Sequence, residues 1–270
     1  MPRFIKKIHY KYPDIGYFPS LDKYLVHGFS WGKNAGNMQF SLGGPVEVRL
    51  RVQKFLDCLN IGKINDSINM IPEHSDRIID INEKRNQSLK RHRFGRSIKC
   101  DAVFTDLPGI TLTTKPGDCT TAIAFCKREN KDVVGIIHTG RRGVEISLPR
   151  KAIKHLINNY RCDIKNIYIG IVPHLFQKNR RFENIDDLDK KIWKGFIRKK
   201  KGYFYPGETE LAIKQYLDSG ILESNFFIYD VDTYKSAARG ETFSYKYHLE
   251  MEKQGKKVQD GRFIVGVRKK

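Results

Sequence analysis

Residues 100–143 read CDAVFTDLPGITLTTKPGDCTTAIAFCKRENKDVVGIIHTGRRG, and this stretch decides the fold class. It contains four short runs rich in β-branched and other apolar residues, at 102–105, 110–114, 121–126 and 133–139. Because turn signals such as Pro-Gly separate them, these runs predict four strands in close succession. No helical pattern lies between the strands, so the sequence favours an α+β fold over a doubly wound parallel sheet.

The flanking sequence supplies helices and more strands. Apolar residues recur at steps of three and four in 52–59, 148–160 and 208–221, which predicts helices with one buried face. Further strand-like runs occur at 24–30, 164–172, 225–230 and 262–267.

The chain has 270 residues, of which 40% are hydrophobic, and can bury a sizeable core. We expect one domain over residues 1–270, because the motifs described below are dispersed and must converge. The polar segment 80–99 predicts a charged excursion from this domain, either a loop or a lid.

Five cysteines form an odd number without framework-like spacing, which predicts reduced thiols in a cytosolic compartment. The N-terminus lacks the apolar stretch of a signal peptide, and no run reaches the length of a membrane span. We therefore expect a cytoplasmic protein without membrane contact, either a monomer or a homodimer.

Lys and Arg number 50 against 30 Asp and Glu, a formal net charge of +20. Such a field attracts phosphate and nucleotides and is also typical of nucleic-acid binding. The basic clusters are scattered, however, and no aromatic-rich RNA motif, helix-turn-helix pattern or zinc-finger spacing accompanies them. The sequence favours solvated surface charge, with weak non-specific nucleic-acid binding at most.

Three residues suggest a metal site. Cys119 follows a Pro-Gly-Asp turn at the start of one predicted strand, His138 lies near the end of the next, and His74 lies in NMIPEHSDRIIDI (69–81). A thiolate and an imidazole at neighbouring strand ends can share a metal ion or act as nucleophile and base. Three such ligands would leave a zinc ion one open position, which is the catalytic arrangement.

A series of motifs, in the same order along the chain, resembles the YfiH-like family, whose members carry the label laccase-domain or multicopper polyphenol oxidase proteins. The matching pieces are HGFSWGKNAGN (27–37), PEHS (72–75), DAVFT (101–105), PGDC (116–119), HTGRRG (138–143), IGIVP (169–173), TFSY (242–245) and GR (261–262). The resemblance spans nearly the whole chain. It implies a layered α/β/β/α sandwich with a metal at one edge.

The chain also departs from the family pattern. Arg141 stands where the family has Trp, Pro72 replaces Gln, Gly117 replaces Ala and Asp232 replaces Cys. These changes leave the three metal-ligand types intact, so the resemblance supports the metal site more firmly than the substrate.

The resemblance implies a zinc-dependent purine nucleoside enzyme, with copper as the older alternative metal. The implied activities are phosphorolysis of inosine, adenosine or methylthioadenosine to base and ribose-1-phosphate, and deamination of adenosine. Zinc fits a hydrolytic site of two histidines and a cysteine better than copper does. The expected partners are purine nucleosides and phosphate.

The family pattern also implies residues around the metal. Asp118 is expected to accept a hydrogen bond from a ligating histidine or to handle a proton, although a plain turn aspartate is the alternative. The expected substrate- and phosphate-binding residues are Arg142, Arg51, Lys33, Asn37 and Arg262. Asn34, Ser244 and Tyr245 are weaker candidates for the same pocket.

Two other functions remain open at this point. Cys119 and His138 could act as nucleophile and base in an amide or peptide hydrolase on the same fold, as relatives of this fold do. Alternatively, the chain is a degenerate, non-catalytic protein whose basic surface binds RNA, and HTGRRG in place of the tryptophan-containing motif supports this interpretation.

Overall fold

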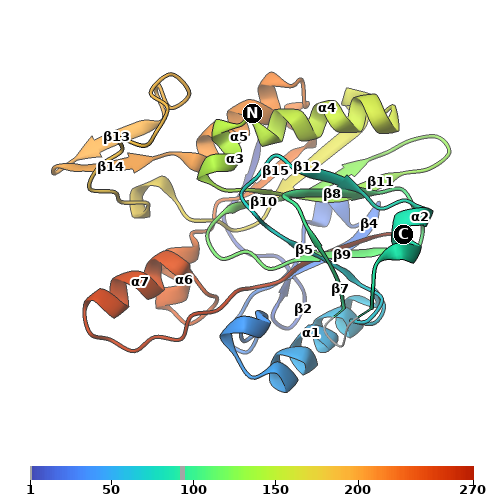
Figure 1. Ribbon diagram of the computed structural model, residues 1–270, viewed down its shortest axis with the longest axis horizontal. Helices are drawn as coiled ribbons and strands as arrows, with labels where there is room; N and C mark the ends of the chain where they lie inside the picture. The colour runs from blue at the N-terminus through green and yellow to red at the C-terminus, as the bar shows by residue number, and fades with distance from the viewer. Residues whose placement is uncertain (1, 92–94) are drawn as a thin grey trace.

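The computed structural model describes residues 2–91 and 95–270, and Figure 1 shows two β-sheets stacked between helices. Helices α3 (Arg141–Glu145), α4 (Leu148–Tyr160) and α5 (Glu208–Asp218) cover one sheet, and α1 (Pro45–Leu59) covers the other. The expected α+β class and α/β/β/α layering are confirmed.

The first sheet has the strand order β1-β15-β12-β10-β11-β8-β6. Its strands are β1 (Arg3–Ile5), β15 (Phe226–Tyr229), β12 (Ile167–Ile171), β10 (Thr120–Cys126), β11 (Val133–Thr139), β8 (Ala102–Thr105) and β6 (Ile78–Asp80). The central strands β12, β10, β11 and β8 are antiparallel to their neighbours within that group. The outer pairs β1–β15, β12–β15 and β6–β8 are parallel.

The second sheet has the order β2-β3-β4-β16-β9-β5-β7. Its strands are β2 (Tyr10–Tyr12), β3 (Ile15–Gly16), β4 (Leu25–Ser30), β16 (Val265–Lys269), β9 (Thr111–Thr114), β5 (Ile68–Ile71) and β7 (Arg96–Lys99). Four predicted strands of the 100–143 stretch are present, but β9 lies in this sheet whereas β8, β10 and β11 lie in the other. The chain therefore crosses between the sheets twice within 40 residues.

Strand β10 shows how the layers are held together. Its side chains alternate between two apolar clusters, as the period of two of a strand requires. Ile123 and Phe125 pack in the cluster that joins the two sheets, and Ala124 and Cys126 pack in the cluster that joins this sheet to α4. Both faces of β10 are buried, which explains why its sequence reads as an almost continuous apolar run.

The segment 80–99 differs from the sequence expectation. It forms α2 (Glu83–Ser88), which Asn82 caps at the N-terminus, and the edge strand β7, which pairs in parallel with β5. Arg96 of β7 is buried and donates a hydrogen bond to the carbonyl of Asn86 at 3.1 Å. The described part of the excursion is thus fixed to the second sheet rather than being a free loop or lid; residues 92–94, which belong to the same prediction, lie outside the described residues.

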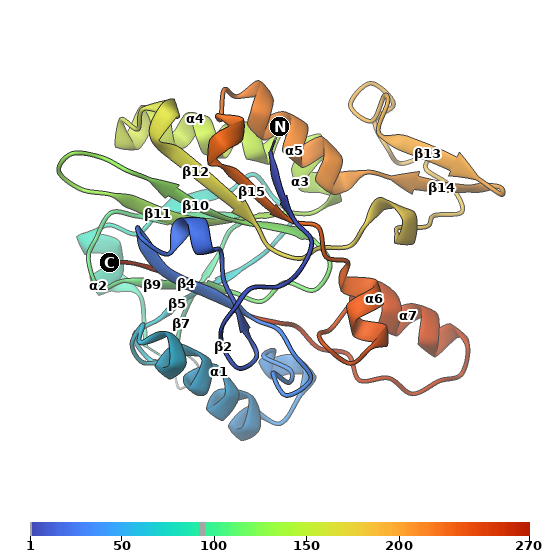
Figure 2. The same ribbon diagram turned by 180° about the vertical axis from the view of Figure 1, so that it is seen from behind.

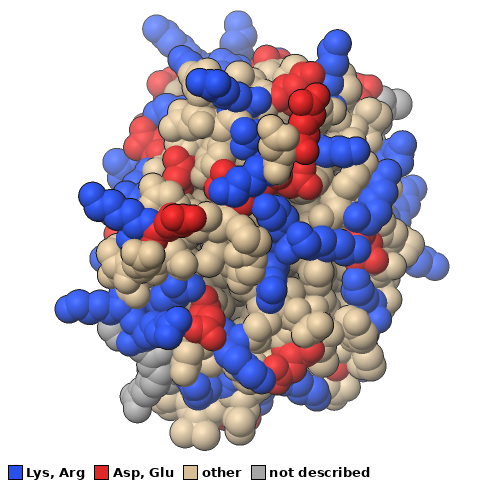
Figure 3. All heavy atoms as spheres, turned by 90° about the vertical axis from the view of Figure 1, so that its right-hand side faces the viewer, with Lys and Arg blue, Asp and Glu red and all other residues tan. Residues whose placement is uncertain are grey.

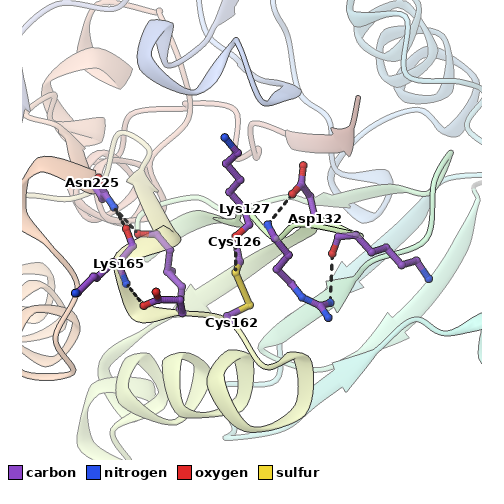
Figure 4. The surroundings of a disulfide bond; sticks show 10 residues. Cys126, Lys127, Asp132, Cys162, Lys165 and Asn225 are labelled. Atoms are coloured by element: carbon purple, nitrogen blue, oxygen red, sulfur yellow. Dashed lines mark hydrogen bonds between the residues drawn. A yellow bond between two sulfur atoms is a disulfide. The ribbon is translucent and has the colours of Figure 1, made fainter.

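The prediction of reduced thiols is wrong for one pair of cysteines. Cys126 at the end of β10 and Cys162 just after α4 form a disulfide, as Figure 4 shows, while Cys58, Cys100 and Cys119 are free. The two partners are 36 residues apart and meet only because α4 packs back onto the sheet, so their spacing carried no signal. This pairing removes the cysteine argument for a cytosolic compartment.

Two elements project from the sandwich. The hairpin of β13 (Ile197–Lys200) and β14 (Tyr203–Pro206) lies beyond α3 and α5, and helices α6 (Thr233–Ala238) and α7 (Tyr245–Lys253) lie beside the sheets on the same side, as Figures 1 and 2 show. Short 3-10 turns connect several strands, at Pro19–Leu21, Phe40–Leu42, Ile164–Asn166, Gln177–Asn179 and Glu223–Asn225. Among the described residues, no helix is both long and apolar enough to cross a membrane.

A candidate metal site of two histidines and a cysteine

Three side chains converge where β10 begins and β11 ends. Cys119 directly precedes β10, and the antiparallel register places Thr121 of β10 opposite His138 of β11. His74 follows β5, so it comes from the other sheet. The ligand atoms of Cys119, His138 and His74 all lie within 4.8 Å of one another.

The donor set fits a single metal ion. In a tetrahedral zinc site, the usual Zn–N and Zn–S bond lengths put neighbouring ligand atoms roughly 3.3–3.6 Å apart. The Sγ atom of Cys119 and the Nε2 atom of His74 are 3.9 Å apart, close to that spacing. His138 is buried, Cys119 is partly buried and His74 is exposed, so the group is open to solvent on the His74 side.

Asp101 holds two of these ligands in place, and sequence reasoning did not assign it a role. Its fully buried carboxylate lies 3.0 Å from Nδ1 of His138, which leaves Nε2 of that ring for a metal ion. The same carboxylate accepts hydrogen bonds from the backbone N–H of Glu73, His74 and Ser75 at 3.1, 3.1 and 2.7 Å. Asp101 begins the DAVFT motif, and an acidic residue at the start of a predicted strand was the sequence signal that could have marked it as a partner of the histidines.

The backbone of His74 needs this support. His74 has a φ of 56°, a left-handed conformation that is unfavourable for a non-glycine residue. Strain of this kind persists where surrounding contacts over-determine the backbone, and it concentrates at functional sites. Here the N–H groups of Glu73, His74 and Ser75 all point to the Asp101 carboxylate, so one buried acid positions both histidines.

Without a metal, the cysteine and the buried histidine form an ion pair. Burial would raise the pKa of the Cys119 thiol, but the charge and hydrogen bond of His138 outweigh it and lower that pKa to about 6. Burial likewise opposes protonation of His138, yet the Cys119 thiolate and Asp101 raise its pKa above the ordinary value. Hydrogen bonds from His138 and Ser75 outweigh burial at Asp101 and lower its pKa to about 2.

We therefore expect Cys119 to react as a thiolate in metal-free protein. Its rate of alkylation by iodoacetamide should reach half its plateau near pH 6, whereas an ordinary thiol titrates near 8.5. Mass spectrometry of labelled peptides over pH 5–9 measures the alkylation rate of Cys119 and, as an internal reference, that of Cys58. Adding one equivalent of zinc should protect Cys119 and leave Cys58 unchanged; a Cys119 profile that follows Cys58 would contradict the ion pair.

Gly140 lies against the ligand group. A Cβ atom at this position would be 2.6 Å from Cδ2 of His74 and 3.3 Å from Sγ of Cys119, so any larger residue must displace a ligand. Gly140 has a φ of −93°, which any residue can adopt. Glycine is therefore required here for lack of space and not for its backbone conformation.

Replacing Gly140 with Ala should weaken metal binding by roughly 10- to 100-fold, the loss typical of a disturbed ligand orientation. The fold should be retained because the backbone is unstrained. A competition titration with a chromogenic chelator measures the affinity, and Gly44→Ala is the control, since its Cβ would lie 3.9 Å from the nearest side-chain atom. Unchanged affinity in Gly140→Ala would mean that the ligands can move apart freely.

The three ligands open into a cavity of about 550 Å³. Apolar and aromatic residues line part of it, among them Leu175, Phe182, Tyr245 and Leu249. Basic residues line the rest, namely Lys115, Arg180, Arg181, Lys246 and Arg262. Of the predicted phosphate-binding residues, Arg262 lines this cavity, and so does the weaker candidate Tyr245. The sequence predicts no role at the site for Arg180, Arg181 or Lys115.

The expected hydrogen bond between Asp118 and a ligating histidine is not formed. One carboxylate oxygen accepts a hydrogen bond from the Thr233 hydroxyl at 2.6 Å, and the other accepts from the backbone N–H of Lys246 at 2.7 Å. Asp118 thus ties the loop before Cys119 to α6 and α7, and Asp101 makes the hydrogen bond to the ligating histidine. The sequence predicts this role at the start of β10, two strands after the position of Asp101 at the start of β8.

The arginines of HTGRRG do not line the cavity. Arg142 is exposed on α3 and Arg141 pairs with Asp187. The first turn of α3 directs both side chains outward, because the following residues Gly143 and Val144 occupy the buried face. The predicted role of Arg142 as a phosphate ligand therefore has no support from the cavity lining.

The other predicted pocket residues lie around two separate hollows. Arg51 and Asn34 line a cavity of about 410 Å³ beside α1, and Lys33 and Ser244 line one of about 170 Å³ against α6 and α7. Asn37 is buried and accepts hydrogen bonds from the backbone N–H of Gln39 and Arg262, a structural role. The Gly-rich loop 32–37 therefore does not reach the metal ligands.

Comparisons with known proteins agree with this fold. Three solved structures share the fold. The hypothetical protein YfiH of Bacillus licheniformis has a TM-score of 0.81 and 18% identity, and the match covers 97% of this chain and 99% of that one. YlmD of Geobacillus stearothermophilus has a TM-score of 0.75 and 15% identity (97% and 98% covered), and the Neisseria meningitidis DUF152 protein NMB0706 has a TM-score of 0.65 and 14% identity (97% of each chain covered). Identities this low show the fold alone. A comparison with curated proteins finds no match.

A sequence model of one family covers most of the chain. The model described as multi-copper polyphenol oxidoreductase laccase matches residues 30–266, which include all three ligands, Asp101 and the basic residues of the cavity. The chain therefore belongs to this laccase-domain family, the YfiH-like family whose motifs it carries.

Proposed function

We propose that this protein is a zinc-dependent enzyme of purine nucleosides, which cleaves them with phosphate and deaminates adenosine. The observation that carries the proposal is the His74, Cys119 and His138 group at the wall of a cavity that holds both cations and aromatic rings. A cavity of about 550 Å³ is in the range of small-molecule sites. Its polar and apolar parts match a phosphate and a purine base.

The donor chemistry favours zinc. One thiolate and two imidazoles form a borderline-soft set that binds zinc well, and three protein ligands are typical of a catalytic zinc site. The same set could also hold copper, the metal in the family's description. When bound, zinc would supply Lewis acidity at the position that the protein leaves open.

The chain's own residues can bind and orient the substrate. Phe182 and Tyr245 offer aromatic faces on which a purine can stack. Arg180 lines the same cavity as Cys119, and its ion pair with the buried Glu208, at 2.9 Å, fixes its direction. Such a held guanidinium can bind phosphate without a further loss of side-chain entropy.

Two balanced reactions fit this arrangement. In phosphorolysis, a phosphate oxygen forms a bond to C1′ of the ribose as the bond to the purine nitrogen breaks, and the base leaves with a proton. In deamination, a water oxygen adds at C6 of adenine and ammonia leaves. The cations of the cavity would stabilise negative charge in the first reaction, so phosphate dependence separates the two.

The test combines metal analysis with a nucleoside panel. Protein purified without added metal should contain about one zinc per chain. It should convert inosine and methylthioadenosine to free base only when phosphate is present, and deaminate adenosine in its absence. Arg142→Ala serves as a control for a basic side chain outside the cavity. No turnover of any nucleoside by zinc-loaded protein would refute the proposal.

A second candidate rests on a specific contact set. Cys119, His138 and Asp101 lie in the order nucleophile, base and orienting acid, and the Cys119 pKa is lowered as a nucleophile requires. This arrangement suits an amide or peptide hydrolase. Its activity should survive chelation and disappear on alkylation of Cys119, whereas the zinc enzyme should lose activity on chelation and regain it with zinc.

A further inference from the structure

The cavity lining carries a large excess of positive charge. Five Lys and Arg residues line it against one carboxylate, that of Asp118. Both oxygens of Asp118 are already engaged, by the Thr233 hydroxyl and the Lys246 backbone N–H. Three of the cations have a carboxylate partner: Arg180 pairs with Glu208, Lys246 with Glu250 and Arg262 with Asp260. None of these carboxylates is among the residues that line the cavity.

Lys115 is held without a counter-ion. Its ammonium donates a hydrogen bond to Oδ1 of Asn69 at 2.7 Å and lies 5.3 Å from the centre of the Phe40 ring. Burial lowers its pKa to about 8, and across the described residues it forms no ion pair. Because a cation withdrawn from water is unfavourable unless it is paired, an anionic ligand in the cavity would stabilise it.

Arg262 lies directly over the backbone next to the metal ligands. A Cβ atom on Gly117 would be 3.2 Å from Cδ and 3.3 Å from Nε of Arg262, so the glycine leaves room for this side chain two residues before Cys119. Gly117 is one of the positions at which the chain departs from the family pattern. Lys115 and Arg262 thus flank the loop that supplies the cysteine ligand.

A second pair of basic residues, Arg181 and Lys246, is joined by one hydrogen bond from a side chain to the backbone. The ammonium of Lys246 donates a hydrogen bond to the backbone carbonyl of Arg181 at 3.2 Å. The guanidinium of Arg181 lies 4.6 Å from the ring centre of Tyr203 in β14, which fixes its plane, and it has no carboxylate partner in the described part of the chain. Arg181 is exposed, whereas Lys115 and Arg180 are partly buried, so Arg181 lies nearer to solvent than they do.

A neutral nucleoside and one inorganic phosphate do not account for this many cations. Lys115, Arg180 and Arg262 suffice for the phosphate that attacks. Arg181, which has no carboxylate partner among the described residues, and Lys246, whose ammonium lies 3.4 Å from Glu250, are then left without a bound phosphate. Lys and Arg side chains are also spread over the face shown in Figure 3, so a test must separate the cations of the cavity from the overall positive charge.

We propose that the cavity takes a nucleoside monophosphate, whose phosphate ester binds between Arg181 and Lys246. The nucleoside part of this inference rests on the proposed function; the phosphate part rests on the cations. The ester phosphate would be held by a guanidinium and an ammonium, the charge-assisted contacts that proteins use for this group. A phosphorylated substrate would then bind more tightly than the nucleoside from which it derives.

The test compares AMP, adenosine and inorganic phosphate on the zinc-loaded protein. Calorimetry should show AMP binding at least about tenfold more tightly than adenosine at low salt, with the difference shrinking as salt screens the contacts. Where turnover occurs, kcat/KM for AMP should exceed that for adenosine. Inorganic phosphate alone should compete with AMP only weakly, because it lacks the base contacts.

Variants locate the ester site. Arg181→Ala and Lys246→Ala should each reduce the affinity ratio of AMP to adenosine by about tenfold, the loss expected for one charge-assisted contact. Lys84→Glu on α2, at the far side of the molecule in Figure 1, changes the net charge more and should leave the ratio unchanged. A ratio that Lys84→Glu lowers equally would mean a diffuse field and would overturn the site.

The outcomes separate this inference from the proposed function. If AMP binds tightly and no purine compound is turned over, the proposed function fails and the phosphate site stands. If adenosine is turned over and AMP binds no better than adenosine, the phosphate site is refuted and the proposed function stands.

Discussion

Cys119→Ala is expected to lose its metal almost completely, from about one zinc per chain to below about 0.1 after dialysis. Cys119 is the only thiolate of the group and supplies its charge, and even a lost supporting contact weakens metal affinity by roughly 10- to 100-fold. The fold should persist, because the two-sheet core does not depend on the metal. Elemental analysis with circular dichroism measures both quantities.

Cys58→Ala is the matched control, since Cys58 is also a free, partly buried cysteine but lies on α1, away from the ligands. It should keep full zinc occupancy. Full occupancy in Cys119→Ala as well would remove Cys119 from the metal site and leave the cysteine-hydrolase candidate as the better explanation of its lowered pKa.

The second large effect is expected at Asp101. Asp101→Asn keeps the shape of the side chain but places an amide N–H₂ group among five hydrogen-bond donors, from Glu73, His74, Ser75 and His138. Zinc affinity should fall by roughly 10- to 100-fold, as for other carboxylate partners of metal-bound histidines. The free energy of unfolding should fall by about 2–4 kcal/mol, because buried donors lose an ionised acceptor.

The pH dependence provides a separate readout for Asp101. Its pKa in the folded chain is about 2, below the ordinary value near 3.9, so its stabilising effect is present above pH 4 and lost as the pH falls towards 2. Chemical unfolding of metal-free protein between pH 2 and 5 should show a shallower slope in Asp101→Asn. Asp163→Asn, which removes an exposed turn carboxylate away from the site, is the control variant. An unchanged slope in Asp101→Asn would mean that Asp101 is not charged in the folded chain.

The family's name and the chemistry of the site point to different reactions. Multi-copper oxidation requires several copper ions, whereas among the described residues one group of three His, Cys or acidic side chains has metal-ligand spacing. One cysteine and two histidines with an open position suit a hydrolytic or group-transfer metal better than an electron-transfer chain. Metal analysis of Cys119→Ala and the wild type answers this point directly.

Local sequence determined the elements whose burial pattern is strong. The runs around Phe104, Phe125 and Ile136 gave strands, and the helix at 148–160 has the bounds that its spacing predicts, because continuous apolar burial and a one-sided helix face are both visible in a short window. Motif order also pointed to His74, Cys119 and His138 as candidate metal ligands, and the structure brings these three side chains together. Edge strands such as β7 escaped prediction, because pairing on one side only leaves a polar sequence.

Tertiary structure alone decided what surrounds the three candidate metal ligands. Asp101 became the partner of both histidines because β8 lies beside β11, and Arg180, Arg181 and Lys246 reached the cavity because the loop after β12 and the start of α7 fold over it. The Cys126–Cys162 disulfide and the outward turn of Arg142 have the same origin. A side chain's type can be read from the chain, but its direction depends on the packing of distant segments, and that direction determines whether a charge faces a ligand or water.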